Sequence, residues 1–586
     1  MNLGPIFIAN MRNGEEFISG MDKVLRDLRS DFDVATEEHS KIKITELKKV
    51  HVDVTGSVST LANSAPGSNG CISGLRGTGK SHLMLIARDL INYERKSFCV
   101  YINLKELFKI GDSTIVDERF YVWGILKQLQ RQLISLIDDD TPETRFQKMM
   151  NLFRKKRDND AKVELLEKVF SKIEKLIYMG DMEMLALART VTTSSLNGTS
   201  SSSRSNVGGA LGVTGPKLES VAEQINGSSS SKKHDESYNV DIFLSTSSLQ
   251  QLLIEVVGVL GLESIVFFYD EWSMLEVVEQ NLLSKLIRSM STSPIYHWIG
   301  YIPYKSTLGV LEQTADMPHR IDLDLQFIYE EDNQICKEYF KRFMNNRIES
   351  VFGSNVLTVG SIVKPQFFDS LVIASMGNTR DFGVMLNKAW QFYKQDFLIK
   401  GNTRFINKKH VVSAIKAVAD EKMNNLKSKN IKYSERLWNE IVKFVGEKKH
   451  THFCIELDNS NVQYINEEEM QDLMYHRLVH LRKKDMTPKD GGEWRLSMYA
   501  VDASVLFSRI FETKSDKKKI KLVTDVNVIH NQVRRYLFEM SSVLDEFRLL
   551  QGKQIKCSCG KYITEDMKLA WEVKKCPYCA TPLLIN

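Results

Sequence analysis

The stretch Gly74-Leu75-Arg76-Gly77-Thr78-Gly79-Lys80-Ser81 decides the fold of this chain. It fits the pattern G-x-x-x-x-G-K-[ST], in which glycines permit a tight loop whose backbone N–H groups point at a triphosphate. We expect Lys80 to reach the β- and γ-phosphates, and Ser81 to hold Mg²⁺ and to open a helix whose dipole attracts the phosphates. The nucleotide-binding residues predicted around this loop are Gly74, Gly77, Thr78, Gly79, Lys80, Ser81 and His82.

The flanking segments have the pattern that such a loop requires. Cys71 and Ile72 form the end of a short apolar stretch, and residues 82–87 have an apolar, helical pattern. A further apolar segment at 97–103 is typical of a buried strand. Strand, helix and strand in succession predict a parallel α/β sheet. The alternative is a glycine-rich turn that matches the pattern by chance, and the next motif counts against it.

A second motif supplies paired carboxylates. The apolar segment at 265–269 ends in Asp270-Glu271. We expect Asp270 to bind Mg²⁺ through its water shell and Glu271 to polarise the water that attacks the γ-phosphate. Such a pair is common by itself, but after a complete phosphate-binding loop it predicts the Walker B motif. The predicted cofactors are therefore ATP and Mg²⁺, with Lys80 and Glu271 as catalytic residues.

The third motif is Gly377-Asn378-Thr379-Arg380-Asp381-Phe382, between two helical stretches. Together the three motifs resemble those of AAA+ P-loop ATPases, and most closely the origin-recognition and initiator branch and bacterial ATPases of that type. The resemblance covers about residues 60–425. It implies that Arg380 is the sensor 2 residue, a further catalytic and nucleotide-binding residue, which reaches the γ-phosphate from a helical lid. The alternative is that Asn378 only caps a helix and Arg380 faces solvent.

Two positions of the AAA+ pattern match less well. The sensor 1 residue at the end of the strand after Walker B is usually Asn, whereas this chain offers Tyr304, Ser306 or Thr307. The arginine finger that would complete a neighbouring subunit's site is either Arg320 or Arg288. Both positions stay unassigned, and without a clear finger the expected hydrolysis is slow or the assembly is not a ring.

After residue 430 the resemblance continues more weakly. A helix at 467–474 followed by strands at 477–484 and 494–499 has the order of a winged helix, which the initiator family uses to bind duplex DNA. The candidate recognition helix is acidic and phosphates would repel it, so the wing is the better predicted DNA surface. The alternative is a domain that packs on the ATPase or on a protein partner. The acidic residues are Glu467, Glu468, Glu469 and Asp472, and the basic wing residues are Arg482, Lys483, Lys484 and Lys489.

The C-terminal tail contains four cysteines in two close pairs. Cys557 and Cys559 form C-x-C, and Cys576 and Cys579 form C-x2-C after 16 further residues. Four thiolates at such spacing suit tetrahedral Zn²⁺, and a tail of this size has too little core to fold without it. We therefore predict structural zinc, with a redox dithiol as the alternative. Several lysines make this end locally basic, which adds modestly to the expectation of nucleic-acid binding.

Composition adds limits rather than a function. The 586 residues include 79 Lys and Arg against 74 Asp and Glu, so the formal charge of +5 says little about nucleic acid. The longest apolar run, residues 252–268, is interrupted by Glu255 and Glu263 and is not expected to span a bilayer. No signal peptide is visible at the start of the sequence. We expect a cytoplasmic protein without a membrane partner.

The predicted fold class is α/β: a P-loop NTPase parallel sheet with a helical lid, then a winged-helix-like α+β domain and a small zinc ribbon. The expected function is an ATPase that acts as a nucleotide-dependent switch on DNA or a DNA-associated complex, as in DNA maintenance or anti-phage defence. The alternative is a signalling scaffold whose nucleotide state controls homo-oligomerisation or a protein partner without nucleic acid. The expected domains are 1–65 (helical lead-in), 66–330 (ATPase core with a low-complexity insertion at 190–237), 331–428 (lid), 429–550 (winged-helix-like domain and helix) and 551–586 (zinc-ribbon-like tail).

Overall fold

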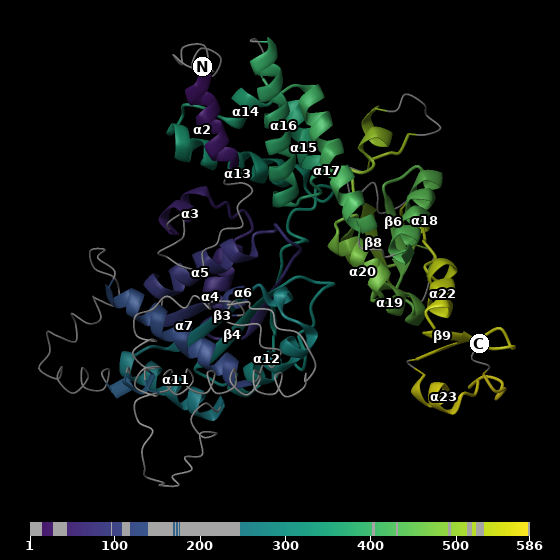
Figure 1. The fold of residues 1–586 in the computed structure, drawn as a ribbon, viewed down its shortest axis with the longest axis horizontal. Coiled ribbons are helices and arrows are strands. Elements are labelled where there is room, and N and C mark those ends of the chain that lie inside the picture. Colours follow the sequence, from purple (N-terminus) through teal and green to yellow (C-terminus); the bar gives the residue numbers. More distant parts are fainter. Residues whose placement is uncertain are drawn as a thin grey trace, which may run out of the picture.

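The fold is described from a computed structural model of the chain (Figure 1). The predicted low-complexity insertion at 190–237 lies outside the described residues, as do the basic residues Lys517 and Lys518. The structure describes residues 14–26, 44–94, 96–107, 118–138, 168–169, 171–173, 175, 246–400, 405–428, 432–489, 491, 494–512, 519–522, 533–565 and 567–583.

A five-stranded parallel sheet forms the centre of the core, in the order β2-β3-β4-β1-β5. In this order β1, which precedes the phosphate-binding loop, lies beside β4. Strand β3, which ends at Asp270, lies between β4 and β2. The carboxyl ends of all five strands therefore meet at one edge, as the predicted parallel sheet requires. The strands are β1 (Gly70–Ser73), β2 (Ser97–Asn103), β3 (Ser264–Asp270), β4 (Ile295–Tyr301) and β5 (His319–Asp322).

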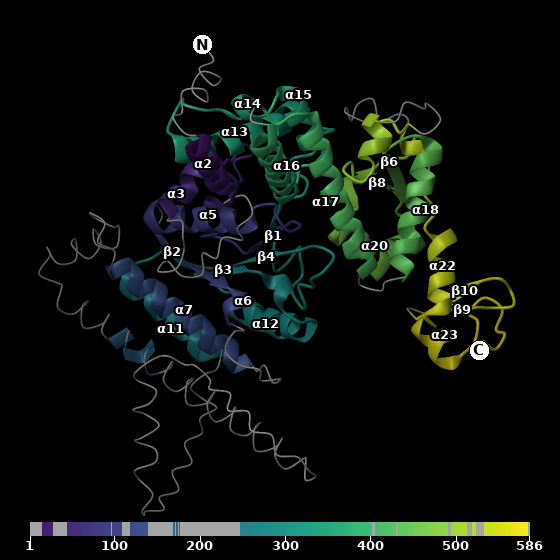
Figure 2. The same ribbon diagram turned by 45° about the horizontal axis from the view of Figure 1, so that its top comes forward.

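Helices cover both faces of the sheet (Figure 2). Because side chains alternate along a strand, Phe98 and Val100 of β2 join the core on one face, and Cys99 and Tyr101 join the core on the other. This burial on both faces explains why the strands are almost wholly apolar. The first face carries α7 (Glu118–Asp138), α11 (Thr246–Leu260) and α12 (Val277–Met290), and the second carries α3 (Ile44–Val50), α4 (Ser57–Ser64) and α5 (Lys80–Glu94).

A bundle of helices forms the lid and recruits a helix from the start of the chain. The amphipathic helix α2 (Gly14–Arg26) places Phe17 and Met21 in the lid core, and its Asp22 accepts a hydrogen bond from Trp390 Nε1 at 2.7 Å. The lid core is thus built from segments that lie on either side of the whole sheet domain in the sequence. The lid helices are α13 (Asn333–Phe352), α14 (Val359–Ile362), α15 (Pro365–Ala374), α16 (Thr379–Lys400) and α17 (Lys408–Ser428).

The winged-helix-like α+β domain lies beside the lid next to α17 (Figure 1). Its antiparallel sheet has the order β6-β8-β7, with two helices between β6 and β7. The predicted helix, strand and strand at 467–499 are confirmed with shifts of one or two residues. The elements are α18 (Lys432–Lys448), β6 (His452–Glu456), α19 (Asn459–Ile465), α20 (Glu468–Tyr475), β7 (Val479–Met486), β8 (Leu496–Val501) and α22 (Ser541–Leu550).

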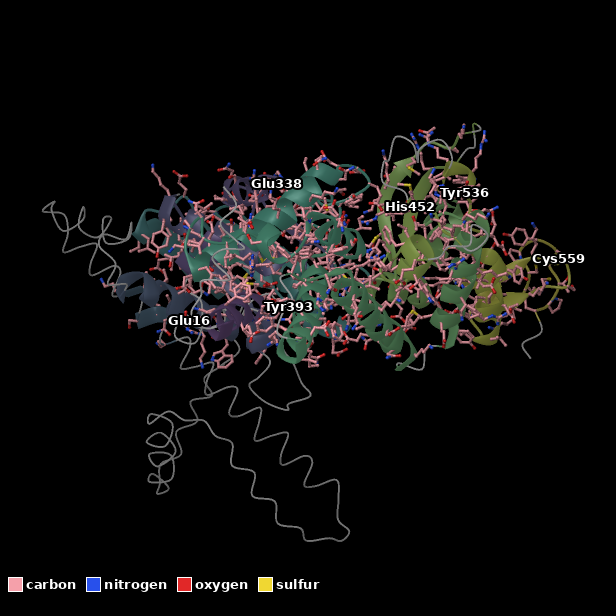
Figure 3. All side chains as sticks on the ribbon, turned by 90° about the horizontal axis from the view of Figure 1, so that it is seen from above. Glu16, Glu338, Tyr393, His452, Tyr536 and Cys559 are labelled. Carbon is pink, nitrogen blue, oxygen red and sulfur yellow. The ribbon has the colours of Figure 1, made fainter. Side chains whose placement is uncertain are left out.

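The cysteine-rich tail forms its own small unit at the end of this domain. It consists of β9 (Gln554–Lys556), which pairs with β10 (Tyr562–Thr564), and the short helix α23 (Lys568–Val573). Figure 3 shows Cys559 at the opposite end of the molecule from Glu16 of α2. The tail is therefore remote from the core and lid. Within the described residues, no helix is long and apolar enough to cross a membrane.

Candidate nucleotide-binding site

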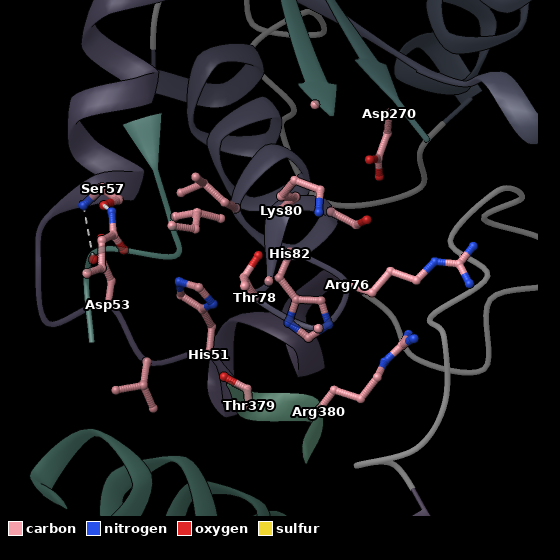
Figure 4. A pocket seen from close by; sticks show the side chains of 18 of the residues that line it. His51, Asp53, Ser57, Arg76, Thr78, Lys80, His82, Asp270, Thr379 and Arg380 are labelled. Carbon is pink, nitrogen blue, oxygen red and sulfur yellow. Dashed lines mark hydrogen bonds between the residues drawn. The ribbon is translucent and has the colours of Figure 1, made fainter. Parts of the chain in front are cut away.

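A pocket opens between the carboxyl edge of the sheet and the lid (Figure 4). The predicted residues Lys80, Asp270, Glu271 and Arg380 all line it, although they come from three distant parts of the chain. The pocket is also lined by residues of the phosphate-binding loop, of the segment before α4, and of α13. From the predicted set these include Gly77, Thr78, Gly79, Ser81 and His82.

The phosphate-binding loop joins β1 to α5 and has the conformation that its glycines permit. Gly77 and Gly79 have φ values of +89° and +94°, which side chains rarely adopt. Lys80 Nζ donates to the carbonyl of Gly74 at 2.6 Å and to that of Leu75 at 3.2 Å, so its ammonium group lies over the loop. Burial lowers the pKa of Lys80, and the nearby Asp270 opposes this effect. The loop therefore presents a cation and backbone N–H groups together, the chemistry that binds phosphate.

Asp270 is held by a hydrogen bond that the sequence did not reveal. Its Oδ2 accepts from the Tyr101 hydroxyl at 2.6 Å, and its Oδ1 accepts from the backbone N–H of Glu271 at 2.8 Å. Burial and the adjacent Asp270 raise the pKa of Tyr101 well above its usual value, so the hydroxyl remains a donor. Tyr101 lies on β2, the neighbour of β3 in the sheet. The hydrogen bond from Tyr101 thereby fixes the Asp270 carboxylate at the edge of the pocket.

The lid approaches the phosphate-binding loop through the Gly377–Arg380 turn. Asn378 Oδ1 accepts from the backbone N–H of Asp381 at 3.1 Å and so caps α16, while its Nδ2 donates to the Arg76 carbonyl at 3.1 Å. A Cβ placed on Gly77 would lie 2.1 Å from Arg380 Cβ, so this loop glycine is required for the contact. Figure 4 shows Arg76 and Arg380 extending toward the same side of the pocket. Asn378 therefore caps the helix, as the alternative interpretation predicted. Arg380 lines the pocket, as the sensor 2 interpretation predicted.

The other end of the pocket is formed by residues that sequence reasoning missed. Arg347 of α13 is buried over the Phe343 ring, 3.7 Å from its centroid, and donates to the Val50 carbonyl at 3.1 Å. His51 and His82 also face this region, with ring centroids 6.5 Å apart. Burial, Arg347 and His51 lower the pKa of His82 to about 3, so its imidazole is neutral at pH 7. The aromatic rings, the neutral imidazole of His82 and the planar guanidinium of Arg347 can pack against a flat heteroaromatic ligand group.

None of the three sensor 1 candidates lines this pocket. Tyr304 is packed against the core of the winged-helix-like domain, and Ser306 forms a hydrogen bond with Ser273 at 2.5 Å. Thr307 uses its carbonyl to accept from Trp272 Nε1 at 2.8 Å. Ser273, which follows the Walker B pair, lines the pocket instead of these three residues.

The role of Tyr101 could have been recognised only from the pairing of β2 with β3, which places it beside Asp270. The sequence alone does not give that pairing.

The two arginine finger candidates also lie outside the pocket. Arg288 is half exposed and lies 3.5 Å from Asp316 Oδ2. Arg320 of β5 donates to Gln313 at 3.2 Å. The prediction that one of them completes a neighbouring subunit's site stays a prediction.

The predicted basic wing surface is wrong for Arg482. This side chain is only 2% exposed, and its guanidinium lies 3.4 Å from the buried carboxylate of Glu330. Lys484 lies 4.0 Å from Asp322 of β5, so it also faces the ATPase core. The reason is that the middle of β7 lies against Met376 and Glu330, whereas Lys484 near its end stays 43% exposed. Charge patterning of one segment cannot reveal a neighbour that comes from a distant part of the chain.

Two of the acidic residues at the start of α20 have partners within the domain. Glu467 lies 3.3 Å from Arg548 and 3.4 Å from Lys553, while the buried Glu469 accepts from Gln551 at 3.0 Å. These carboxylates are therefore internal partners of the α22 region. They do not form the free acidic surface that the sequence predicted would repel phosphates.

The four tail cysteines come together as predicted. Their Sγ atoms all lie within 4.8 Å of one another, with Cys557 and Cys579 at 3.5 Å and Cys559 and Cys576 at 3.7 Å. For a metal–sulfur bond of about 2.3 Å, tetrahedral geometry places the sulfurs about 3.8 Å apart. The arrangement can hold a metal ion. It is the one group of three or more metal-ligating side chains found among the described residues.

The sheet order and the loop between β1 and α5 together define a P-loop NTPase fold. In structure the chain is similar to a Walker-type ATPase of Pyrococcus abyssi, with 11% identity and a TM-score of 0.34, over 78% of this chain and 95% of that chain. It is also similar to Cdc6p from Pyrobaculum aerophilum, with 10% identity and a TM-score of 0.29, over 81% of this chain and 94% of that chain. Because these TM-scores are low, the fold and site rest on this chain's own sheet and residues.

A sequence family described as "Putative phage metallopeptidase" matches residues 390–527, less than half of the chain. In the described part of that range, no three potential metal ligands come together. Instead, each of three histidines lies 3.0 Å from one carboxylate: His410 from Asp396, His452 from Glu330 and His480 from Asp502. No curated protein matches the sequence.

Proposed function

We propose that this chain is an ATPase of the AAA+ class, similar to the initiator branch, that binds ATP and Mg²⁺ between the core and the lid. The observation that carries this proposal is the convergence of Lys80, the Asp270-Glu271 pair and Arg380 on one pocket. Phosphoryl transfer needs little covalent chemistry, so positioning and charge stabilisation perform most of the work. The pocket supplies both, since it is lined by the cations Lys80 and Arg380 and by the carboxylates Asp270 and Glu271.

Each residue has a separate role in the proposed reaction. Lys80 stabilises the β- and γ-phosphates, and Ser81 and Asp270 hold Mg²⁺ at the carboxyl edge of the sheet. Tyr101 keeps the Asp270 carboxylate oriented through its 2.6 Å hydrogen bond. Glu271 accepts a proton from the attacking water, and Arg380 reports the γ-phosphate to the lid. The side chains of His51, His82 and Arg347 enclose the base.

Replacement of Lys80 by alanine tests the nucleotide site. We expect Lys80→Ala to weaken ATP binding at least about 30-fold, because a charge-assisted bond to phosphate is worth about 2 kcal/mol or more. Isothermal titration with ATP and Mg²⁺ measures the change. Lys96→Ala is the matched control, since Lys96 lies at the opposite edge of the sheet and pairs with the exposed Glu263 at 3.6 Å. Equal affinity in the Lys80→Ala and wild-type proteins would refute the site.

We further propose that the four tail thiolates bind structural zinc. Four cysteine ligands fill the tetrahedral shell and leave no position for a substrate, so a catalytic metal is not expected there. The distances between the sulfur atoms support this proposal over a redox dithiol. A dithiol would need only one pair of cysteines, whereas here two pairs converge.

The tail also carries the surface that best supports coupling to DNA. Lysine ammonium groups lie over three aromatic rings, at 5.3 Å for Lys556 and Tyr562, 5.8 Å for Lys561 and Tyr578, and 4.7 Å for Lys574 and Trp571. Tyr578 is 60% exposed. Cations beside exposed aromatic rings provide both phosphate contacts and stacking platforms for bases. The DNA contact is therefore proposed for the tail instead of the wing.

The signalling scaffold remains the second candidate, because Arg482 is buried beside Glu330 and is not available to DNA. DNA titration separates the two. If the tail binds DNA, DNA is expected to raise ATP turnover at low salt, and the effect should weaken steeply between about 50 and 200 mM salt as phosphate contacts are lost. Phosphate release measured with and without DNA checks this. Turnover that is unchanged by DNA, with no DNA bound at low salt, would favour the scaffold.

A further inference from the structure

A buried cluster of charges joins the lid to the winged-helix-like domain. Lys422 of α17 lies 2.8 Å from Asp381 of α16 and 2.8 Å from Asp502, which follows β8. The three side chains are 4%, 3% and 0% exposed. Arg477, between α20 and β7, donates to Asp381 through two nitrogens at 3.0 Å each. His480 of β7 lies 3.0 Å from Asp502. Each of the two carboxylates, Asp381 and Asp502, has partners in both domains.

This cluster begins one residue from the proposed γ-phosphate sensor. Asp381 directly follows Arg380 in the first turn of α16, and its backbone N–H is held by Asn378, which also bonds to the phosphate-binding loop. A rigid helical turn carries both side chains. Any shift of the α16 backbone at Arg380 therefore shifts Asp381 by a comparable amount.

The pair of Asp381 and Arg477 is suited to pass on such a shift. Its two parallel hydrogen bonds fix both the distance and the orientation of the guanidinium. Burial by itself raises the pKa of Asp381. The positive charges of Lys422 and Arg477 lower this pKa by a larger amount, so it lies below its usual value and the carboxylate is charged at neutral pH. Separation of the pair would leave a buried charge without its partner, which is strongly unfavourable. The junction of α20 and β7 is thus expected to follow α16.

A second buried contact provides a fixed point for this movement. Glu330, in the segment before α13, lies 3.0 Å from His452 Nε2 on β6 and 3.4 Å from Arg482 on β7. Glu330 and His452 are almost fully buried. Two of the buried polar contacts of the winged-helix-like domain therefore lie at different places, one where the core meets the lid and one at the start of α16. Movement of one contact relative to the other would rotate the domain.

We propose that Asp381 and Arg477 are positioning residues that couple the nucleotide at Arg380 to the orientation of the winged-helix-like domain. This inference rests on the proposed function, because it requires a nucleotide that Arg380 senses. Coupling between two sites is reciprocal: docking of the domain raises ATP affinity by the factor by which ATP stabilises docking. Arg477 touches no nucleotide in this scheme and acts through Asp381 alone.

Hydrogen exchange of the full chain, with and without a non-hydrolysable ATP analogue and Mg²⁺, tests the coupling. In the wild type, the analogue is expected to protect amides of residues 74–83 and also those of 470–482. Arg477→Gln is expected to keep the first change at saturating analogue and to lose the second. Its affinity for the analogue should fall at least about 5-fold, the lower end of typical coupling. Arg477→Lys, which keeps the charge but not the double hydrogen bond, should show a reduced change at 470–482.

Arg548→Gln is the matched control. Arg548 is buried and pairs with Glu467 at the opposite end of α20, away from the lid. It should retain the change at 470–482. Equal loss of that change in Arg548→Gln and Arg477→Gln would overturn the coupling, because it would indicate a general loosening of α20. Protection at 74–83 without any change at 470–482 in the wild type would also overturn it. An absence of protection at 74–83 in the wild type would overturn the proposed function itself.

Discussion

The Glu271→Gln protein is expected to bind ATP and Mg²⁺ as the wild type does and to lose ATP turnover by about 10²- to 10⁴-fold, the usual contribution of a general base. Glutamine has nearly the same shape but cannot accept a proton from water. The substitution also leaves the backbone bond from Glu271 to Asp270 in place, so the metal-binding carboxylate should keep its orientation. The loss should therefore fall on the chemical step and not on binding.

Phosphate release at saturating ATP, together with titration of ATP binding, measures this effect. Glu263→Gln is a suitable control, since Glu263 lies just before β3 at the opposite end of the same strand and is exposed. Turnover near the wild-type rate in Glu271→Gln would mean that another group activates the water. Loss of binding together with turnover would mean instead that Glu271 contributes to holding the nucleotide or its metal.

Removal of the tail metal is expected to unfold residues 551–583 while the rest of the chain remains folded. Among the described residues of the tail, the fully buried apolar core consists of Cys557, Ile563, Cys576 and Leu583, so two of its four members are proposed metal ligands. Such a core cannot offset the conformational entropy of the tail, and metal binding supplies the folding free energy. Cys576→Ser should have the same effect as chelation, because three thiolates bind zinc far more weakly than four.

Metal analysis of the purified protein should find about one zinc ion per chain, and limited proteolysis should cut the tail after chelation or in Cys576→Ser. Ser558→Ala changes a residue between two ligands without removing a thiol, and it should retain both the zinc and the resistance to protease. Wild-type protein that contains no zinc and keeps an intact tail would contradict the structural metal. Faster cleavage in the core after chelation would show that the tail is not an independent unit.

The sequence was most informative where the pattern is local. The strand predicted at 97–103 matches β2, and the helical periodicity of residues 277–290 predicts a helix that matches α12, since both patterns can be read within a short window. The convergence of the phosphate-binding loop, Asp270 and Arg380 also followed from motifs. The alternating pattern at 321–327 predicts a strand less accurately, because β5 covers His319–Asp322 and ends before Asp324, whose carboxylate accepts from the Leu75 N–H at 3.0 Å.

The remaining features depend on contacts between distant segments. The hydrogen bond of Tyr101 to Asp270 requires the pairing of β2 with β3, two strands that are far apart in the sequence. The sequence pattern predicts that Arg482 is an exposed wing residue, whereas in the structure it is buried beside Glu330. The same holds for Arg347, whose role depends on the segment before α4. The environments of these side chains are set by residues that are distant in the sequence, and a single sequence does not show which residues those are.

The position of α2 in the lid core has a consequence during synthesis on the ribosome. Phe17, Met21, Val24 and Leu25 leave the ribosome early, but their partners on α13 and α16 follow only after the whole sheet domain has been made. At a translation rate of about 5 to 20 residues per second, the residues of α16 that contact this apolar face are synthesised roughly 20 to 75 seconds after it. During that interval the helix is a binding target for chaperones. The lid, and with it the nucleotide pocket, can close only once nearly the whole ATPase region has been translated.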